Sequence, residues 1–177
     1  MHNRSICVIF TLLLLSYNHA HSQESKIPNL SINLIDGTKA KIQDLAKDGP
    51  LIIDFWATWC IPCKKLMKHL NKFVLDYGDQ GLTVLMINVD SPRSIGKVKT
   101  YIKSQDYQFL VGLDPNKIIS KKLNNVVMPT TILVDTDGNI IWRHQGYVQG
   151  EEKLIRKQIE AILMNDYGNE SDLPPDV

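Results

Sequence analysis

The sequence predicts an α/β fold, a mixed sheet of about five strands with helices on both faces, from three observations. Two nearly continuous apolar segments rich in β-branched residues, at 51–57 and 82–89, are typical of strands buried on both faces of a sheet. Residues 62–77 between them carry apolar side chains at helical spacing, which predicts a β-α-β unit with parallel strands. The turn TDGN at 136–139 separates two further apolar runs, as in a β-hairpin.

The same criteria assign the remaining elements in chain order. Asp36-Gly37 lies between two short alternating runs, which predicts a small N-terminal β-hairpin. A central insert then lies between Asp90 and Met128, and it contains two stretches of helical periodicity and one short apolar run. The expected elements are a hairpin at 30–42, a helix at 94–104, a strand at 109–113, a helix at 115–123, strands at 130–135 and 139–144, and a closing amphipathic helix at 151–163.

The N-terminus has the pattern of a signal peptide. Arg4 is the only charged side chain before Glu24, and an apolar run follows it at 6–15. Ala20 and Ser22 then form a cleavage pattern of small residues. The run is shorter than the roughly 20 apolar residues of a transmembrane helix. We therefore expect a signal peptide at 1–22 and an exported, periplasmic protein, or a membrane-anchored one if the signal is not cleaved.

After export, the chain is expected to comprise one domain at 23–165 and a flexible, polar tail at 166–177. Removal of Arg4 leaves 19 basic and 19 acidic side chains, a balance that does not favour nucleic acid or an anionic membrane as partner. Cys7 lies within the apolar run and is lost with it. The exported chain therefore contains only Cys60 and Cys63, whereas exported proteins stabilised by disulfides usually carry several pairs closing longer loops.

The motif Cys60-Ile-Pro-Cys63 could be half of a zinc site, a structural crosslink or a reversible redox pair. A helix that begins at Cys60 places this sulfur where unpaired N–H groups and the helix macrodipole favour a thiolate. Cys63 lies one turn further on and is expected to be more enclosed. We therefore expect Cys60 to attack a partner disulfide and Cys63 to resolve the mixed disulfide. Pro62 suits the first helical turn, where its missing N–H is not needed.

A structural zinc site is disfavoured by the available ligands. Such a site needs four ligands, and the exported chain adds only a few histidines to the two cysteines. His69 is expected on another side of the helix, His144 follows a distant strand, and His21 lies near the cleavage site. We therefore expect no bound metal and no cofactor other than the disulfide.

Two longer motifs make this pattern more specific. DFWATWCIPC follows an apolar strand, and VMPTTILVDTDG lies downstream; together they resemble the thioredoxin superfamily. The leading SINLIDGTKAKIQDL and the central insert resemble the exported TlpA/ResA-type thiol-disulfide oxidoreductases, and the similarity covers about residues 27–163. A copper-delivery relative would require C-x-x-x-C. A peroxiredoxin would require P-x-x-x-T before a single cysteine, where this chain has Ile53 and Ala57.

The resemblance implies a proton-transfer role for an aspartate. Asp54 interrupts an apolar strand, so we expect it to be buried with a raised pKa. It matches an aspartate that moves protons for the second cysteine of thioredoxins, which makes it a candidate general acid/base for Cys63. Thioredoxin has a lysine beside that aspartate, whereas this chain has Met86. Asp90, at the end of the next strand, is an alternative source of the acid.

The resemblance also implies binding and tuning residues. Pro129 is expected to follow a cis peptide bond from Met128 and to leave the Met128 backbone free to pair with an extended partner chain. Trp59 is expected to form an exposed rim near Cys60, so Trp59, Met128 and Pro129 are the candidate substrate-binding residues. Ile61 and Pro62, between the cysteines, are the candidates for tuning the redox potential.

The predicted function is reduction of disulfides in cysteine-containing envelope proteins by a monomeric thioredoxin-fold enzyme. By resemblance, a membrane thiol donor would supply the electrons, as in cytochrome c maturation or envelope thiol repair. Two alternatives stay open at this point. The direction of exchange depends on the reduction potential of the pair, so the protein could instead be a disulfide-forming oxidant. It could also be a noncatalytic binding module that keeps the fold for docking.

Overall fold

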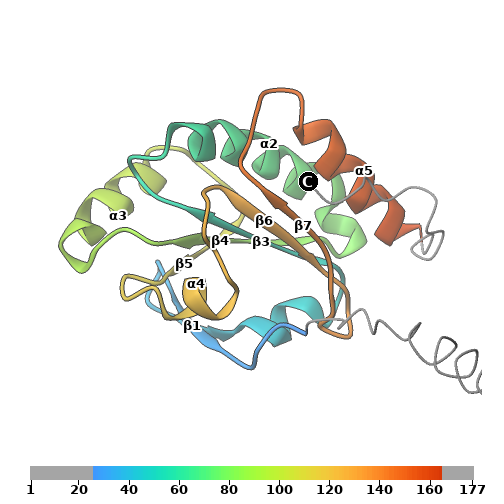
Figure 1. Ribbon diagram of the computed structural model, residues 1–177, viewed down its shortest axis with the longest axis horizontal. Helices are drawn as coiled ribbons and strands as arrows, with labels where there is room; N and C mark the ends of the chain where they lie inside the picture. The colour runs from blue at the N-terminus through green and yellow to red at the C-terminus, as the bar shows by residue number, and fades with distance from the viewer. Residues whose placement is uncertain (1–25, 165–177) are drawn as a thin grey trace, which may run out of the picture.

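The computed structural model describes residues 26–164, and seven strands in this range form one sheet in the order β2-β1-β5-β4-β3-β6-β7 (Figure 1). The strands are β1 (Ser31–Leu34), β2 (Lys39–Lys41), β3 (Leu51–Trp56), β4 (Thr83–Asn88), β5 (Leu110–Leu113), β6 (Thr130–Val134) and β7 (Ile140–Gln145). β3 and β4 are parallel and so are β4 and β5, whereas the remaining neighbours are antiparallel. The sheet is therefore mixed, as predicted.

Helices cover both faces of this sheet. Figure 1 shows α2 and α5 along one face and α4 on the other. α3 packs against β3 and α2, since the ring of Tyr101 lies 5.6 Å from that of Trp56 on β3 and 4.9 Å from the Lys64 ammonium on α2. No helix within residues 26–164 is long and apolar enough to cross a membrane. The α-helices are α2 (Ile61–Tyr77), α3 (Ile95–Lys103), α4 (Ile118–Lys122) and α5 (Glu152–Leu163), and short 3-10 turns occupy Ile42–Ala46, Gly78–Gln80 and Pro92–Ser94.

The core lies on both faces of the central strands. Every residue of β3 and β6 is buried, which explains why their sequences are almost continuously apolar. Three buried side chains of these two strands are polar: Asp54 on β3, and Thr130 and Thr131 on β6. Because buried polar groups carry a desolvation cost, these exceptions mark the part of the sheet where a functional site is to be sought.

The predicted elements are present, with two differences in detail. The five predicted strands are β3 to β7, and the N-terminal hairpin pairs through β1 with β5, so the sheet has seven strands. α4 begins at Ile118, later than the predicted residue 115. The carboxylate of Asp114 explains the delay, because it accepts hydrogen bonds from the Ile118 and Ser120 N–H groups at 2.8 Å each. The predicted signal peptide at 1–22, with Cys7, and the predicted tail at 166–177 lie outside the described residues.

Candidate active site

Cys60 and Cys63 form a disulfide at the start of α2. Cys60 is the N-cap residue with extended backbone geometry, and its Sγ accepts a hydrogen bond from the Cys63 N–H at 3.3 Å. Pro62 lies in the first turn of the helix, as predicted. Cys60 is 5% exposed and Cys63 is fully buried. An incoming sulfur can therefore reach only Cys60, and the helix end provides the Cys63 N–H as a donor to the same atom.

An exposed apolar surface surrounds this disulfide. Trp59 and Ile61, on either side of Cys60, are 67% and 68% exposed. The peptide bond between Met128 and Pro129 is cis, as predicted, and it directly precedes β6. β6 is antiparallel to β3, with Thr130 opposite Phe55, so this loop leaves the sheet at the edge where β3 continues towards Cys60.

The loop before Pro129 carries two exposed residues that the sequence interpretation missed. Val126 is 84% exposed and Val127 is 45% exposed. The sequence did contain a signal for them, since two adjacent valines lie where no helix or strand is expected. Apolar side chains in a loop have no core to fill, so they indicate a contact surface.

Asp54 is fully buried in the middle of β3. The Thr131 hydroxyl donates a hydrogen bond to its Oδ2 at 2.6 Å, and Oδ1 has no partner among the described residues. Burial raises the pKa of Asp54 to about 8, although the Thr131 hydrogen bond acts in the opposite direction. Met86 lies opposite Asp54 on β4, so no cation offsets the burial from that position. The carboxyl group is therefore mostly protonated at neutral pH.

The Cys63 side chain contacts β3 at the residue that follows Asp54. The Cys63 Sγ is 3.9 Å from the carbonyl oxygen of Phe55, the residue after Asp54. Thr131, which sets the orientation of the carboxyl group, was missed in the sequence. The antiparallel pairing of the two strands places Thr131 opposite Asp54, and only the register reveals this.

Asp90 has a different environment from Asp54. Its carboxylate accepts hydrogen bonds from the Thr58 N–H at 2.7 Å, the Thr58 hydroxyl at 2.8 Å and the Asn88 side-chain amide at 2.8 Å. Asp90 and Asn88 are both buried. The carboxylate thus fixes the turn that precedes Trp59 and Cys60. Thr58 and Asn88 were missed in the sequence, and the parallel register that pairs Trp56 with Asn88 brings them together.

The two described histidines lie in separate environments. The His69 ring centre is 6.3 Å from that of Tyr147, and His144 stacks on Trp142 with its Nε2 3.3 Å from a Glu151 carboxylate oxygen. Within residues 26–164, no group of three histidine, cysteine or acidic side chains is arranged to hold a metal ion. His21 lies outside the described residues.

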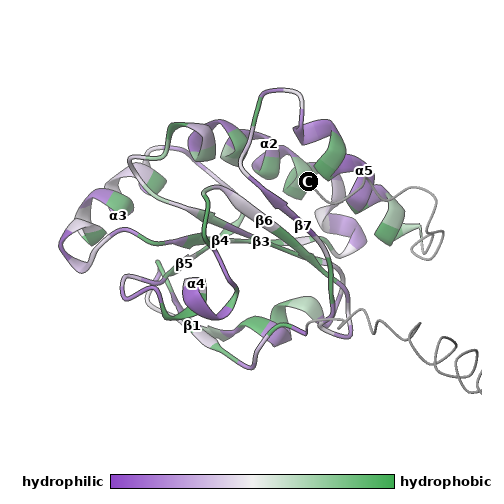
Figure 2. Ribbon diagram, viewed as in Figure 1, coloured by the Kyte–Doolittle hydropathy of each residue, from purple (hydrophilic) through white to green (hydrophobic). Residues whose placement is uncertain are grey.

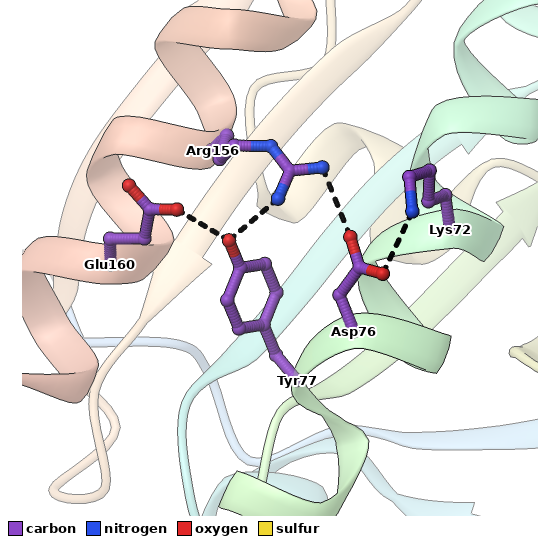
Figure 3. Close-up of polar contacts among 5 residues, drawn as sticks. All are labelled: Lys72, Asp76, Tyr77, Arg156 and Glu160. Atoms are coloured by element: carbon purple, nitrogen blue, oxygen red, sulfur yellow. Dashed lines mark hydrogen bonds and ion pairs between the residues drawn. The ribbon is translucent and has the colours of Figure 1, made fainter.

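The far end of α2 is fixed to α5 by a polar cluster (Figure 3). The Arg156 guanidinium donates to the Tyr77 hydroxyl at 2.7 Å and to Asp76 at 3.0 Å, and its carbon lies 4.9 Å from the Phe73 ring centre. The Tyr77 hydroxyl donates in turn to Glu160, and Lys72 pairs with Asp76. The helix that carries the cysteines at its start is thus anchored at its end.

Comparison with known proteins agrees with this geometry. The family model described as Redoxin matches residues 22–162. The thiol-disulfide oxidoreductase ResA of Bacillus cereus is 29% identical over 91% of this chain and 95% of its own length. The thioredoxin-like protein YneN of Bacillus subtilis is 32% identical over 77% of this chain and 75% of its own.

Among solved structures, an uncharacterized thioredoxin-like protein from Porphyromonas gingivalis superimposes with a TM-score of 0.68. It is 27% identical, and the match covers 78% of this chain and 92% of that one. The sequence motifs, the mixed sheet and the position of the disulfide at a helix start thus agree with the family match. The chain belongs to the Redoxin family, within the thioredoxin superfamily.

Proposed function

We propose that this protein is a thiol-disulfide oxidoreductase of ResA type that reduces disulfides in partner proteins outside the cytoplasm. The observation that carries the proposal is the Cys60–Cys63 disulfide at the start of α2, with Cys60 at the surface edge and Cys63 enclosed. The relatives named as ResA-type oxidoreductases support the same chemistry.

Each turnover moves two electrons and two protons to the partner. In the dithiol form, the Cys60 thiolate attacks one sulfur of a partner disulfide, and the bond between the partner sulfurs breaks. The leaving partner thiolate takes up a proton, and a mixed disulfide remains on Cys60. Cys63 then loses its proton and attacks Cys60, which forms the Cys60–Cys63 disulfide and releases the second partner thiol. A membrane thiol donor would return the pair to the dithiol form.

Asp54 is the group that we assign to proton transfer at Cys63. Its pKa of about 8 lies close to that of an ordinary thiol, about 8.5, so a proton can pass between the two groups in either direction with little driving force. After releasing its own proton, which its pKa of about 8 allows in a minor fraction of molecules at neutral pH, Asp54 accepts the Cys63 proton as Cys63 attacks, and the protonated carboxyl group returns it when a donor opens the disulfide. Asp90 is not assigned this role, because three hydrogen-bond donors already occupy its carboxylate.

The experiment that tests the direction of exchange is measurement of the Cys60/Cys63 reduction potential in a series of thiol redox buffers. A value near that of thioredoxin, about −270 mV, supports the reductant, whereas a value near about −120 mV identifies a disulfide-forming oxidant. Every ~30 mV between them corresponds to about 1.4 kcal/mol. Insulin reduction in the presence of dithiothreitol separates both from a noncatalytic binding module. Cys60→Ser is the control, and activity no greater than that of this variant would exclude an enzyme.

A further inference from the structure

Three segments adjoin the end of the sheet from which β3 continues to the disulfide. β3 and β4 are parallel and end at Trp56 and Asn88, which are register partners. β6 runs the other way beside β3 and begins at Thr130. Residues 57–65, 88–94 and 121–129 adjoin this end of the sheet and include the first turn of α2 and the end of α4, and we call them the site rim.

The site rim is basic, although the chain as a whole is nearly neutral. The sequence contains 20 lysines and arginines against 19 acidic residues. Asp90 is the acid within these three segments, and it is 4% exposed and hydrogen-bonded to Thr58 and Asn88. A fourth segment borders the rim, because the Gly146 N–H donates to the Pro129 carbonyl at 2.7 Å. Its acids, Glu151 and Glu152, accept hydrogen bonds from the Val148 N–H and from the Tyr147 hydroxyl and Gly150 N–H. Figure 2 shows hydrophilic residues on α4 and on much of α3, the helices next to the rim. The basic residues of the rim are Lys64, Lys65, Arg93, Lys121 and Lys122.

These rim cations have no internal counter-charge. None of them forms an ion pair with a residue in the described range 26–164. Lys65, Arg93, Lys121 and Lys122 are exposed, and Lys64 lies 4.9 Å from the ring centre of Tyr101. Unpaired charges around a small site produce a local field that attracts groups of opposite sign.

The centre of the rim is apolar. Eight large hydrophobic side chains are exposed within residues 26–164, and four of them belong to the rim. Protein-binding sites commonly have an exposed apolar centre, which packs against the partner, and a charged border, which distinguishes one partner from another. The four are Trp59, Ile61, Val126 and Val127.

We propose that the site rim selects protein segments in which the reactive disulfide is flanked first by apolar and then by acidic residues. This inference rests on the proposed function and names its substrate class. The apolar neighbours of the partner cysteine would pack on Trp59 and Val126, while aspartates and glutamates further along would face Lys65 and Lys122. The charges would act chiefly on the rate of encounter, because surface charges steer association more than they add to affinity.

The test uses reduced protein in single turnovers, so that no other reductant is needed. Two peptides share one disulfide with the same apolar neighbours, and glutamates flank it in one and lysines in the other. We expect the acidic peptide to react about tenfold faster or more at low ionic strength. The ratio should approach one at about 1 M salt, where the Debye length falls to about 3 Å.

Charge reversal then locates the effect. Lys121→Glu combined with Lys122→Glu should lower the ratio of acidic to basic peptide rates about tenfold, and Lys65→Glu with Arg93→Glu is an independent pair for the same measurement. The matched control is Lys39→Glu with Lys41→Glu, since both lysines are exposed on the edge strand β2, which β1, β5 and β4 separate from β3. This control changes the net charge equally and should retain the wild-type ratio.

Three outcomes would contradict the inference. They are equal rates for the two peptides, an equal change of the ratio in the rim and control variants, and binding to phosphatidylglycerol vesicles without any discrimination between peptides. The last outcome would assign the basic rim to a lipid surface. Failure of reduced wild-type protein to react with either peptide would instead contradict the proposed function itself, so the two failures are distinguishable.

Discussion

Replacement of Asp54 by asparagine should stabilise the protein and remove a large part of its pH dependence. The folded protein keeps this carboxyl group protonated up to a pKa of about 8, whereas an unfolded chain releases the proton at its ordinary pKa of 3.8. The stability contribution of wild-type Asp54 is therefore greatest below pH 3.8. It is lost progressively as the pH rises to about 8 and is constant above that.

The size of the effect follows from the pKa difference. At about 1.4 kcal/mol per pKa unit, wild-type protein should lose up to about 4 kcal/mol at pH 7 relative to a permanently neutral side chain. The corresponding difference is about 1.7 kcal/mol at pH 5 and approaches about 6 kcal/mol above pH 8. Asparagine is nearly isosteric, and its side-chain oxygen can still accept the Thr131 hydrogen bond.

The assay is urea unfolding of the oxidised wild-type and Asp54→Asn proteins at pH 5, 7 and 9. The gain in unfolding free energy should grow from pH 5 to pH 7 and again to pH 9, because it levels off only above the folded-state pKa of about 8. Asp79→Asn is the matched control, because this carboxyl group is exposed in a 3-10 turn, and its profile should run parallel to that of wild type. A gain in Asp54→Asn that is equal at all three pH values would refute the buried, protonated state on which the assignment depends.

Three further predictions concern the sulfurs, the turn before them and the helix that carries them. Cys63→Ser should accumulate mixed disulfides with partners on non-reducing gels, and Cys60→Ser far fewer; equal trapping would overturn the order of attack. Thr58→Val removes a donor to buried Asp90 and should cost about 1–3 kcal/mol in urea unfolding and alter the pH dependence of Cys60 alkylation, whereas Thr58→Ser should restore both. Arg156→Ala should lower stability by about 1–2 kcal/mol, with disulfide-exchange rates retained, and a slowed exchange would contradict a purely anchoring role.

The central strands and the redox motif could be predicted because their signals are local. A strand buried on both faces needs an unbroken apolar run, and β3 and β4 have one. The Cys-x-x-Cys spacing spans one helical turn, so it indicates which sulfur lies at the helix end before any tertiary contact is known. The cis bond at Pro129 and the buried Asp54 were also foreseen, through a resemblance of specific residues rather than through periodicity.

The hydrogen-bond partners of the site residues and the charges around them could be known only from the tertiary structure. The Asp54 hydrogen bond comes from Thr131, 77 residues away, and the Asp90 hydrogen bonds reach back 32 residues to Thr58. Strand register sets both contacts, and a shift of one residue would turn these side chains to the other face. The balanced composition likewise concealed the basic rim, because net charge sums over the whole chain, whereas a partner meets only the charges that folding gathers at one edge of the sheet.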